Sequence, residues 1–175
     1  MTTRPRPTAN ERTFAEDEVI VSKTDAKGRI VYANDVFCKV GLYEEDELLG
    51  KPHSIVRHPD MPRAVFRLLW DRIQGGEEIF AYVKNMAKSG DCYWVFAHVT
   101  PSFAPDGAIN GYHSNRRVPD RTAIGRIEPV YRELLAIETA SADRGAGMAA
   151  SGARLAAMLQ ASSQSYDEFV FGVGQ

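Results

Sequence analysis

Two short features of the sequence carry residue types that suit a ligand site. Arg57-His-Pro-Asp60 brings a guanidinium, an imidazole and a carboxylate together just before a stretch with helical spacing. An arginine beside a helix N-terminus favours a diphosphate-bearing ligand, because both supply N–H donors to an anion. Asn85 lies within a β-rich run, where asparagine is uncommon, and its amide can match the donors and acceptors at the edge of a heterocycle. These residues are candidates for binding a ligand that has both a diphosphate and a heterocycle.

Every candidate also has an ordinary structural explanation. Asp60 equally suits a cap for the helix that follows it, and Asn34 suits the cap of an earlier helix. His58 is explained as well by a loop histidine, and Arg57 by a surface ion pair. Asn85 is the least easily explained in this way, because it lies in mid-strand.

The composition is that of an ordinary globular protein. Of the 175 residues, 44% are hydrophobic and 25% are charged, and the formal net charge is −2, which gives no electrostatic reason to expect nucleic acid as a partner. No segment approaches the roughly 20 apolar residues that cross a bilayer. Cys38 and Cys92 belong to no CxxC or Cys/His array, which fits a reducing compartment and argues against a structural zinc site. The polar start of the chain lacks a secretory signal, so we expect a cytoplasmic protein without direct membrane insertion.

The first part of the sequence predicts a hairpin followed by short helices. Residues 18–23 and 28–33 are β-rich runs on either side of a turn. Asn34 then suits the N-cap of a short helix that ends at Gly41. A second short helix is expected over 44–48.

A longer helix and three strands follow. We expect the helix to begin at an Asp60 cap and to end at Gly75-Gly76. Its apolar stripe, which should face a sheet, comprises Val65, Leu68, Leu69 and Ile73. The three β-like segments lie at about 78–87, 92–103 and 108–118. Strands at both ends of a helical middle imply an α+β domain, with a five-stranded antiparallel sheet, short helices on one face and a pocket between them.

The segment Lys51-Pro-His-Ser-Ile-Val-Arg-His-Pro-Asp-Met-Pro62 resembles the signature of the PAS domains of aerotaxis receptors, energy-taxis proteins whose PAS domains bind FAD non-covalently. Further matches occur in the same order and spacing at Tyr32–Asp35, Val83–Asn85, Lys88–Asp91 and Tyr93–Val95. The resemblance covers about residues 14–135. It implies a PAS fold and a flavin site that is lined or braced by Asn34, Arg57, His58, Asp60 and Asn85.

The resemblance also assigns the two faces of the sheet. In flavin-binding PAS relatives the tryptophan at position 94 faces away from the cofactor, and Phe96 and His98 should follow it, because strand residues alternate. The opposite face should then line the pocket with Tyr93, Val95, Ala97 and Val99 on one strand and with Tyr112, Ser114 and Arg116 on the next. Arg116 also matches the family.

Some residues depart from the family pattern. The family often has a tryptophan in the first strand after the long helix, where this chain has the segment Glu77–Tyr82. Residues 49–74 contain no cysteine, so the blue-light adduct chemistry of photosensing relatives is not expected. The alternatives to FAD are a cofactor-free interaction module and a haem gas sensor that uses one of the four histidines. His98 and His113 are approximate cross-strand neighbours on the outer face, where they form either a bis-histidine haem site or two half-exposed surface histidines near a helix or dimer contact.

The C-terminal part of the sequence predicts helices. Ile124, Ile127, Tyr131 and Leu134 form a seam with coiled-coil spacing, Pro129 should kink or restart that helix, and Gly145 and Gly147 should interrupt it. Ser165–Glu168 resembles a capping box for a last turn. The seam either packs on a partner or folds back over the sheet. We therefore divide the chain into a flexible tail (1–13), a PAS sensory domain (14–119) and a C-terminal helical signalling or dimerisation region (120–175).

No catalytic triad, phosphate loop or metal-ligand spacing stands out, so an enzyme is not expected. The sequence instead predicts a cytoplasmic redox or oxygen sensor that binds FAD and forms a homodimer. Because no output domain is recognisable, its conformational change is expected to act on a chemoreceptor-type or other signalling protein.

Overall fold

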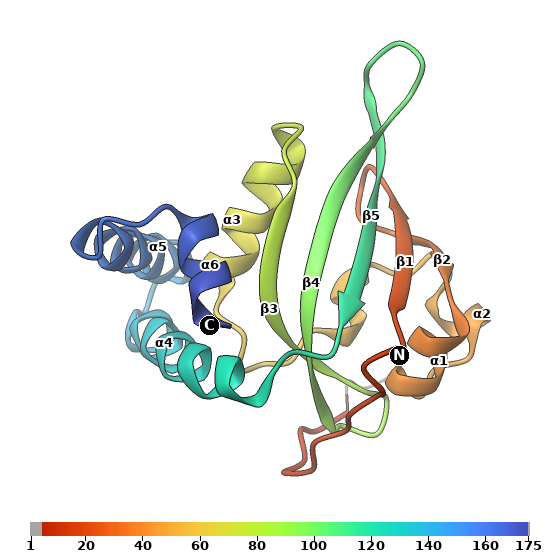
Figure 1. Cartoon of the computed structure of the whole chain (residues 1–175), viewed down its shortest axis with the longest axis horizontal. Helices are drawn as coiled ribbons and strands as arrows, with labels where there is room; N and C mark the ends of the chain where they lie inside the picture. The colour runs from red at the N-terminus through yellow and green to blue at the C-terminus, as the bar shows by residue number, and fades with distance from the viewer. Residues whose placement is uncertain (1–4, 175) are drawn as a thin grey trace.

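The computed structural model describes residues 5–174, in which five strands form one antiparallel sheet with helices on both of its faces. The strands are β1 (Ile20–Asp25), β2 (Ile30–Ala33), β3 (Ile79–Met86), β4 (Cys92–Phe103) and β5 (Ile109–Arg117). Their order is β2-β1-β5-β4-β3, so the first hairpin joins the later strands where β1 pairs with β5 (Figure 1). The predicted α+β fold with a five-stranded antiparallel sheet is confirmed.

Helices from the middle of the chain cover the inner face of the sheet. They are α1 (Asp35–Gly41), α2 (Glu45–Leu48), the 3-10 helix η1 (His53–Val56) and α3 (Arg63–Gln74). Asn34 caps α1 as predicted, since its Oδ1 accepts a hydrogen bond from the Phe37 N–H at 3.1 Å. The same oxygen accepts from the Val21 N–H at 2.9 Å, so this side chain also ties α1 to β1.

The start of α3 differs from the prediction. The helix begins at Arg63, with Pro62 at the N-cap position and no side-chain cap from the adjacent sequence. Asp60 lies too far before this first turn to cap it, and instead accepts a hydrogen bond from Lys84 Nζ at 2.8 Å. Glu138, from the C-terminal part of the chain, accepts from the Arg63 and Ala64 N–H groups, each at 2.9 Å. The prediction that Asp60 caps this helix is therefore wrong.

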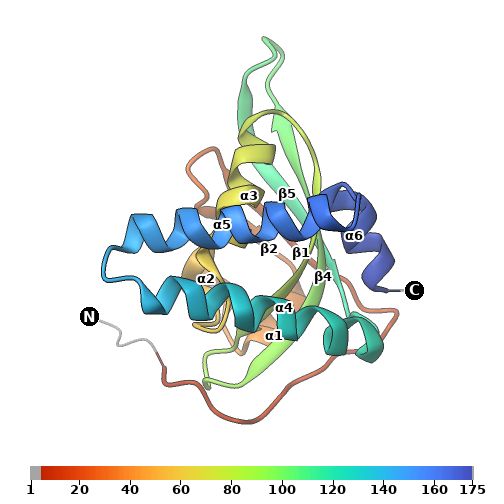
Figure 2. The same cartoon turned by 90° about the vertical axis from the view of Figure 1, so that its left-hand side faces the viewer.

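Three C-terminal helices enclose the edge of the sheet that β3 forms. They are α4 (Arg121–Ala140), α5 (Arg144–Ala161) and α6 (Tyr166–Val173). Figure 2 shows α4 and α5 side by side and antiparallel, with α6 at one end of the pair. The helix α4 continues through Pro129, and the break falls at residues 141–143, so the predicted interruption at Gly145 and Gly147 is wrong. The predicted capping box at Ser165 is confirmed.

Side chains of α4 and α6 cover the outer face of β3 and β4. Tyr131 of α4 stacks on Trp94, with ring centroids 6.3 Å apart, and its hydroxyl donates to the Tyr82 carbonyl at 2.7 Å. Phe171 of α6 lies 4.8 Å from the Phe80 ring and 6.1 Å from the Phe96 ring. The seam that was expected to pack either on a partner or on the sheet is buried within this chain.

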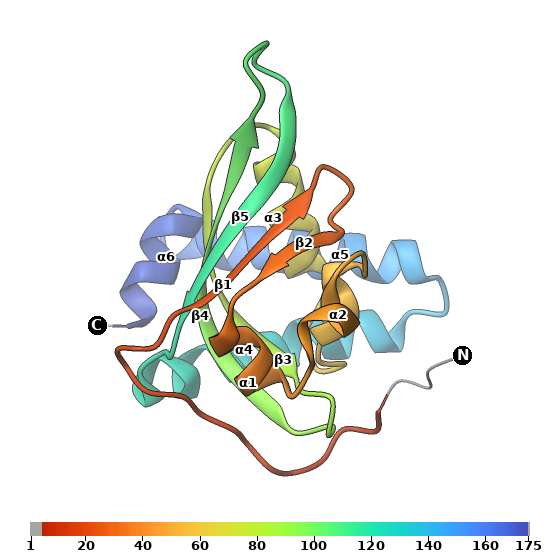
Figure 3. The ribbon, with the colours of Figure 1, turned by 90° about the vertical axis from the view of Figure 1, so that its right-hand side faces the viewer.

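The N-terminal segment runs beside the start of β4, as Figure 3 shows along the lower edge of the molecule. The Thr8 N–H donates to the Gly90 carbonyl at 2.9 Å, and the Arg12 N–H donates to the Cys92 carbonyl at 2.7 Å. Residues 1–4 of the expected flexible tail lie outside the described residues. The later part of that tail is therefore hydrogen-bonded to the domain.

Replacing Tyr131 by Phe should lower the free energy of unfolding by about 1–2 kcal/mol, because the buried Tyr82 carbonyl loses its hydroxyl donor while the ring stacking is kept. Chemical denaturation followed by fluorescence measures this difference. The matched control is Tyr32→Phe, at a side chain that is 43% exposed, where a change within about 0.5 kcal/mol is expected. Equal stabilities of the two variants would contradict the assigned role of Tyr131.

Candidate functional site

A cavity of about 340 Å³ lies between the inner face of the sheet and the helices that cover it. Its sheet wall is formed mainly by small apolar side chains from β3 and β4, namely Val83, Val95, Ala97 and Val99. The opposite wall is formed by α3 through Phe66, Leu69, Trp70 and Ile73. The volume falls at the small end of the range for ligand pockets, roughly 300–1,000 Å³. The two walls make an apolar slot that suits a flat ring system.

Arg116 places a positive charge at the inner end of this slot. The residue is 2% exposed, and burial lowers the pKa of its guanidinium to about 10, an effect that the nearby Tyr93 partly offsets. Its Nη2 donates to Ser22 Oγ at 2.5 Å, and its guanidinium lies 4.4 Å from the centre of the Phe37 ring. Nε and Nη1 have no hydrogen-bond partner among residues 5–174. Because buried donors are rarely left unpaired, these two groups indicate a ligand that accepts hydrogen bonds.

His53 completes the polar end of the cavity as a neutral imidazole. Its Nε2 lies within hydrogen-bond distance of Ser22 Oγ, at 3.1 Å, and the same Ser22 oxygen accepts a hydrogen bond from Arg116. Desolvation, with a smaller contribution from the Arg116 charge, lowers the pKa of His53 to about 3. The ring is therefore neutral at neutral pH, and Arg116 is the positive charge at this end of the site.

Arg57 and Asn85 come together at the outer edge of β3. The two residues form an isolated antiparallel bridge through their backbones, and both side chains line the cavity. The Arg57 guanidinium lies 4.4 Å from the centre of the Phe66 ring, and its Nη2 donates to the Met61 carbonyl at 3.1 Å. The Asn85 side chain is buried next to the Tyr93 hydroxyl. This edge of the slot offers an amide and a second guanidinium.

The structure brings most of the predicted site residues to the cavity, but not all of them. The lining includes Arg57, Asn85, Val95, Ala97, Tyr112, Ser114 and Arg116. Asn34, His58, Asp60 and Tyr93 do not line it. Asn34 anchors α1, Asp60 pairs with Lys84 near the protein surface, and His58 is buried with its Nδ1 accepting from the Asp60 N–H at 3.1 Å. Tyr93 is fully buried in the core beside Asn85, where burial raises the pKa of its hydroxyl.

Several lining residues were missed from the sequence. Ser22 and Thr24 alternate along β1, so the period-two rule applied to the first strand could have found them. His53 lies within the quoted segment Lys51–Pro62, but nothing in the sequence distinguished it from His58. Phe66 and Trp70 lie beside the predicted apolar stripe of α3, which was expected to face the sheet across a pocket, but these two residues were not part of that stripe.

Gly28 allows the turn between β1 and β2 to approach Trp70 of α3 closely at the cavity. Its φ of 76° lies in the left-handed region, and a Cβ there would lie 2.8 Å from Cη2 of Trp70. Trp70 in turn meets Tyr112 edge to face, with ring centroids 5.4 Å apart. A glycine is therefore needed where the turn between β1 and β2 meets the wall formed by α3.

The histidines proposed as haem ligands lie on the other side of the sheet. His98 is paired with Asn115 in the ladder and His113 with Thr100, so the expected pairing is offset by two residues. His98 stacks on Phe80 and contacts Glu78 at 2.6 Å. Within residues 5–174, no group of three or more His, Cys, Asp or Glu side chains is arranged to hold a metal ion. None of the helices described is both long enough and apolar enough to cross a membrane.

The sequence pattern of the family described as the PAS fold matches residues 30–115, which contain most of the cavity wall. The chain contains a PAS domain. It is 40% identical over 139 residues to the aerotaxis receptor of Escherichia coli (strain K12), and the match covers 79% of this chain and 27% of that receptor. The predicted resemblance to the aerotaxis-receptor PAS domain is confirmed. This chain spans about a quarter of the length of that relative.

Solved structures share the same PAS fold. The dark structure of the blue-light photoreceptor aureochrome1 LOV has a TM-score of 0.53 and 24% identity, and the match covers 69% of this chain and 83% of that one. A light-oxygen-voltage domain studied with a flavin analogue has a TM-score of 0.55 and 19% identity, covering 66% of this chain and 87% of that one. At these identities the likeness concerns the fold alone.

His53 should make the stability of this PAS domain depend on pH. Its pKa is about 3 in the folded state and about 6.5 when unfolded, so between these values the unfolded chain binds the extra proton and stability falls as the pH is lowered. The expected loss from this residue is about 2 kcal/mol at pH 5 relative to pH 7. Denaturation at pH 5, 6 and 7 measures it.

His53→Gln should remove this part of the pH dependence, because glutamine does not titrate. His98→Gln, on the outer face, is the control and should keep it. An unchanged slope in His53→Gln would show that this half-buried imidazole is not the group that titrates.

Proposed function

We propose that this PAS domain binds FAD and works as a redox or oxygen sensor, and not as an enzyme. The observation that carries the proposal is the buried Arg116, which lines an apolar slot in a domain of the aerotaxis-receptor type and keeps two N–H donors without a partner among residues 5–174. A flavin ring has a flat apolar body and a polar edge with carbonyl oxygens. The slot between α3 and the sheet, with Arg116 and Asn85 at its polar positions, is suited to such a group.

The open end of the cavity suits the remainder of the cofactor. Lys27, Pro52 and Ser54 line the cavity and are exposed to solvent, so the ribityl and nucleotide part of the cofactor could extend between them to the surface. The ammonium of Lys27 offers a favourable charge for a diphosphate in this region. The cavity volume of about 340 Å³ is consistent with enclosing the ring while the rest of the cofactor extends toward solvent.

The residues of the slot would respond to a change of charge on the ring. A bound flavin supplies reversible electron uptake. Arg116 favours the more negative state of its ligand, because a cation in a low-dielectric site interacts strongly with a nearby anionic group. His53 stays neutral beside it and adds no second charge. Asn85 offers both a donor and an acceptor, so it accommodates either hydrogen-bonding pattern at the ring edge.

We further propose that the sensor acts in the cytoplasm, as a homodimer, on a chemotaxis or other signal-transduction partner. The support is the identity to an aerotaxis receptor over a part of that receptor. A conformational change at the cavity would be passed on through the C-terminal helices, which pack on both β3 and α3.

The purified protein should show the absorption spectrum of an oxidised flavin and should release FAD on denaturation. Arg116→Met should weaken flavin binding by roughly 10- to 100-fold, because hydrogen bonds from a charged group contribute about 1.5–3 kcal/mol. It should also make the midpoint potential more negative, since the cation is removed. Occupancy, titration with FAD and potentiometry measure these effects.

His98→Ala is the control, because His98 lies on the opposite face of the sheet and should leave binding and potential unchanged. A Soret band in the purified protein would favour the haem sensor. A folded, colourless protein that takes up no FAD on reconstitution would favour the cofactor-free interaction module.

A further inference from the structure

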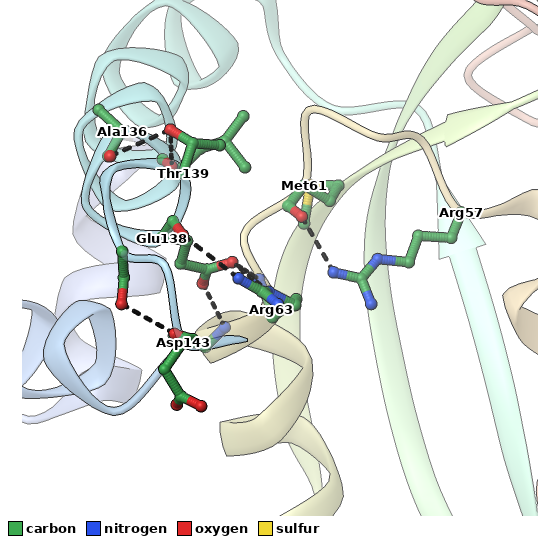
Figure 4. A network of polar contacts seen from close by, with 10 residues as sticks. Arg57, Met61, Arg63, Ala136, Glu138, Thr139 and Asp143 are labelled. Atoms are coloured by element: carbon green, nitrogen blue, oxygen red, sulfur yellow. Dashed lines mark hydrogen bonds and ion pairs between the residues drawn. The ribbon is translucent and has the colours of Figure 1, made fainter. Parts of the chain in front are cut away.

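The contact between Glu138 and the first turn of α3 joins the cavity wall to the C-terminal helices. Glu138 Oε2 accepts from the Arg63 N–H and from Arg63 Nε, and Oε1 accepts from the Ala64 N–H, each at 2.9 Å. Figure 4 shows this carboxylate directed from α4 into the start of α3. Since α3 has no cap from its own sequence, the carboxylate of α4 satisfies donors that would otherwise be unpaired.

The burial of this contact makes it different from a surface ion pair. The Glu138 side chain is 1% exposed and the Arg63 side chain 19%. Burial alone would raise the pKa of the Glu138 carboxyl, but the hydrogen bonds from Arg63 and Ala64 outweigh it and hold that pKa below its ordinary value. The carboxylate is therefore charged at neutral pH, and separating it from α3 would leave a buried charge without partners.

The helix α5 also packs closely against α4 at Glu138. A Cβ on Gly147 would lie 2.9 Å from the Glu138 carbonyl oxygen and 3.0 Å from the Ser141 Cβ, so only a glycine lets α5 approach α4 this closely. Any shift of Glu138 relative to α3 therefore moves the beginning of α5 as well.

The other side of the α3 start belongs to the cavity. Arg57 lines the cavity, stacks on Phe66 of α3 and donates to the carbonyl of Met61, two residues before Arg63. Figure 4 shows Arg57 and Met61 on one side of this segment and Glu138 on the other. A short stretch of chain thus contacts the ligand cavity through Arg57 and the C-terminal helices through Arg63.

We propose that Glu138 couples the ligand state of the cavity to α4 and α5: a ligand-dependent shift of Arg57 and the start of α3 changes how firmly these two helices are held. The inference rests on the proposed flavin function, and it assigns a positioning role to a residue outside the cavity. Coupling of this kind is reciprocal, so the state of the Glu138 contact also alters the affinity of the cavity for each redox form of its ligand.

Hydrogen exchange of the full chain, with the flavin oxidised and then demonstrably reduced, tests the proposal. The wild-type protein should change its protection over α4 and α5 between the two states. Glu138→Gln should keep the flavin spectrum, exchange roughly 10- to 100-fold faster in α4 and α5, lose the redox difference there and shift the midpoint potential. Glu133→Gln is the matched control: its carboxylate pairs with Arg154 at 2.6 Å on the exposed surface of the same helix, so it should behave as wild type.

Equal protection of α4 and α5 in both redox states of the wild type would overturn the proposal, as would a full redox difference in Glu138→Gln. If Glu138→Gln frees the helices in both states, Arg63→Gln provides the comparison, because it keeps the two backbone hydrogen bonds to Glu138. Because the contact remains, a redox difference in α4 and α5 should persist in that variant, and equal protection in both redox states would overturn the proposal. If the protein binds no flavin, the proposed function is refuted instead. The contact between α3 and α4 can still be tested in that case, because it predicts slower exchange of α4 and α5 in Glu133→Gln than in Glu138→Gln.

Discussion

Arg116 is a cation held in an apolar interior, and the polar part of the cavity is arranged around that constraint. Ser22 accepts a hydrogen bond from one of the Arg116 N–H groups, and the Phe37 ring lies against the guanidinium. His53 stays neutral because desolvation and the Arg116 cation both oppose a second positive charge. Two donors remain without a partner among the described residues. An unpaired buried donor costs about 1–3 kcal/mol, so an acceptor that bound to these N–H groups would stabilise the protein by a comparable amount. Such a site recognises its ligand through donors that are already in place.

The helix α3 has two roles that normally belong to separate elements. One of its faces forms the apolar wall opposite the sheet, through residues such as Leu69 and Trp70. Its N-terminus is held by Glu138, and near its C-terminal end Arg72 binds both carboxylate oxygens of Asp167 in α6, at 2.8 and 2.9 Å. The wall of the cavity is therefore attached at both ends to helices that have no contact with the cavity centre.

The strands and the lining of the sheet could be predicted from the sequence, because both follow from local patterns. The resemblance placed Trp94 on the face away from the cavity, and alternation along β4 then placed Val95 and Ala97 on the cavity side; the turn residues bounded the strands closely. The helix cap could not be predicted in this way. Asp60 has the right chemistry and lies next to the helix, whereas Glu138 is 75 positions from Arg63 and meets it only after the C-terminal helices have folded back. The His53 and Ser22 pair was missed for the same reason, since a hydrogen bond across 31 positions leaves no local pattern.

Two paths lead from the cavity to the C-terminal helices, and they differ in stiffness. One passes through the sheet, where Tyr131 of α4 binds the Tyr82 carbonyl on the back of the cavity wall. In that region β3 pairs with β4 continuously from Ile79 to Met86, so its backbone is fixed by a ladder of hydrogen bonds. The other passes through the start of α3, which no ladder fixes and which depends on Glu138 for its first-turn partners. A small displacement at a ligand site produces a large structural change when it switches a contact between two distinct arrangements. A packed layer that deforms evenly gives no such amplification. The start of α3 meets that condition better than the sheet, because its hydrogen bonds to Glu138 are either made or broken.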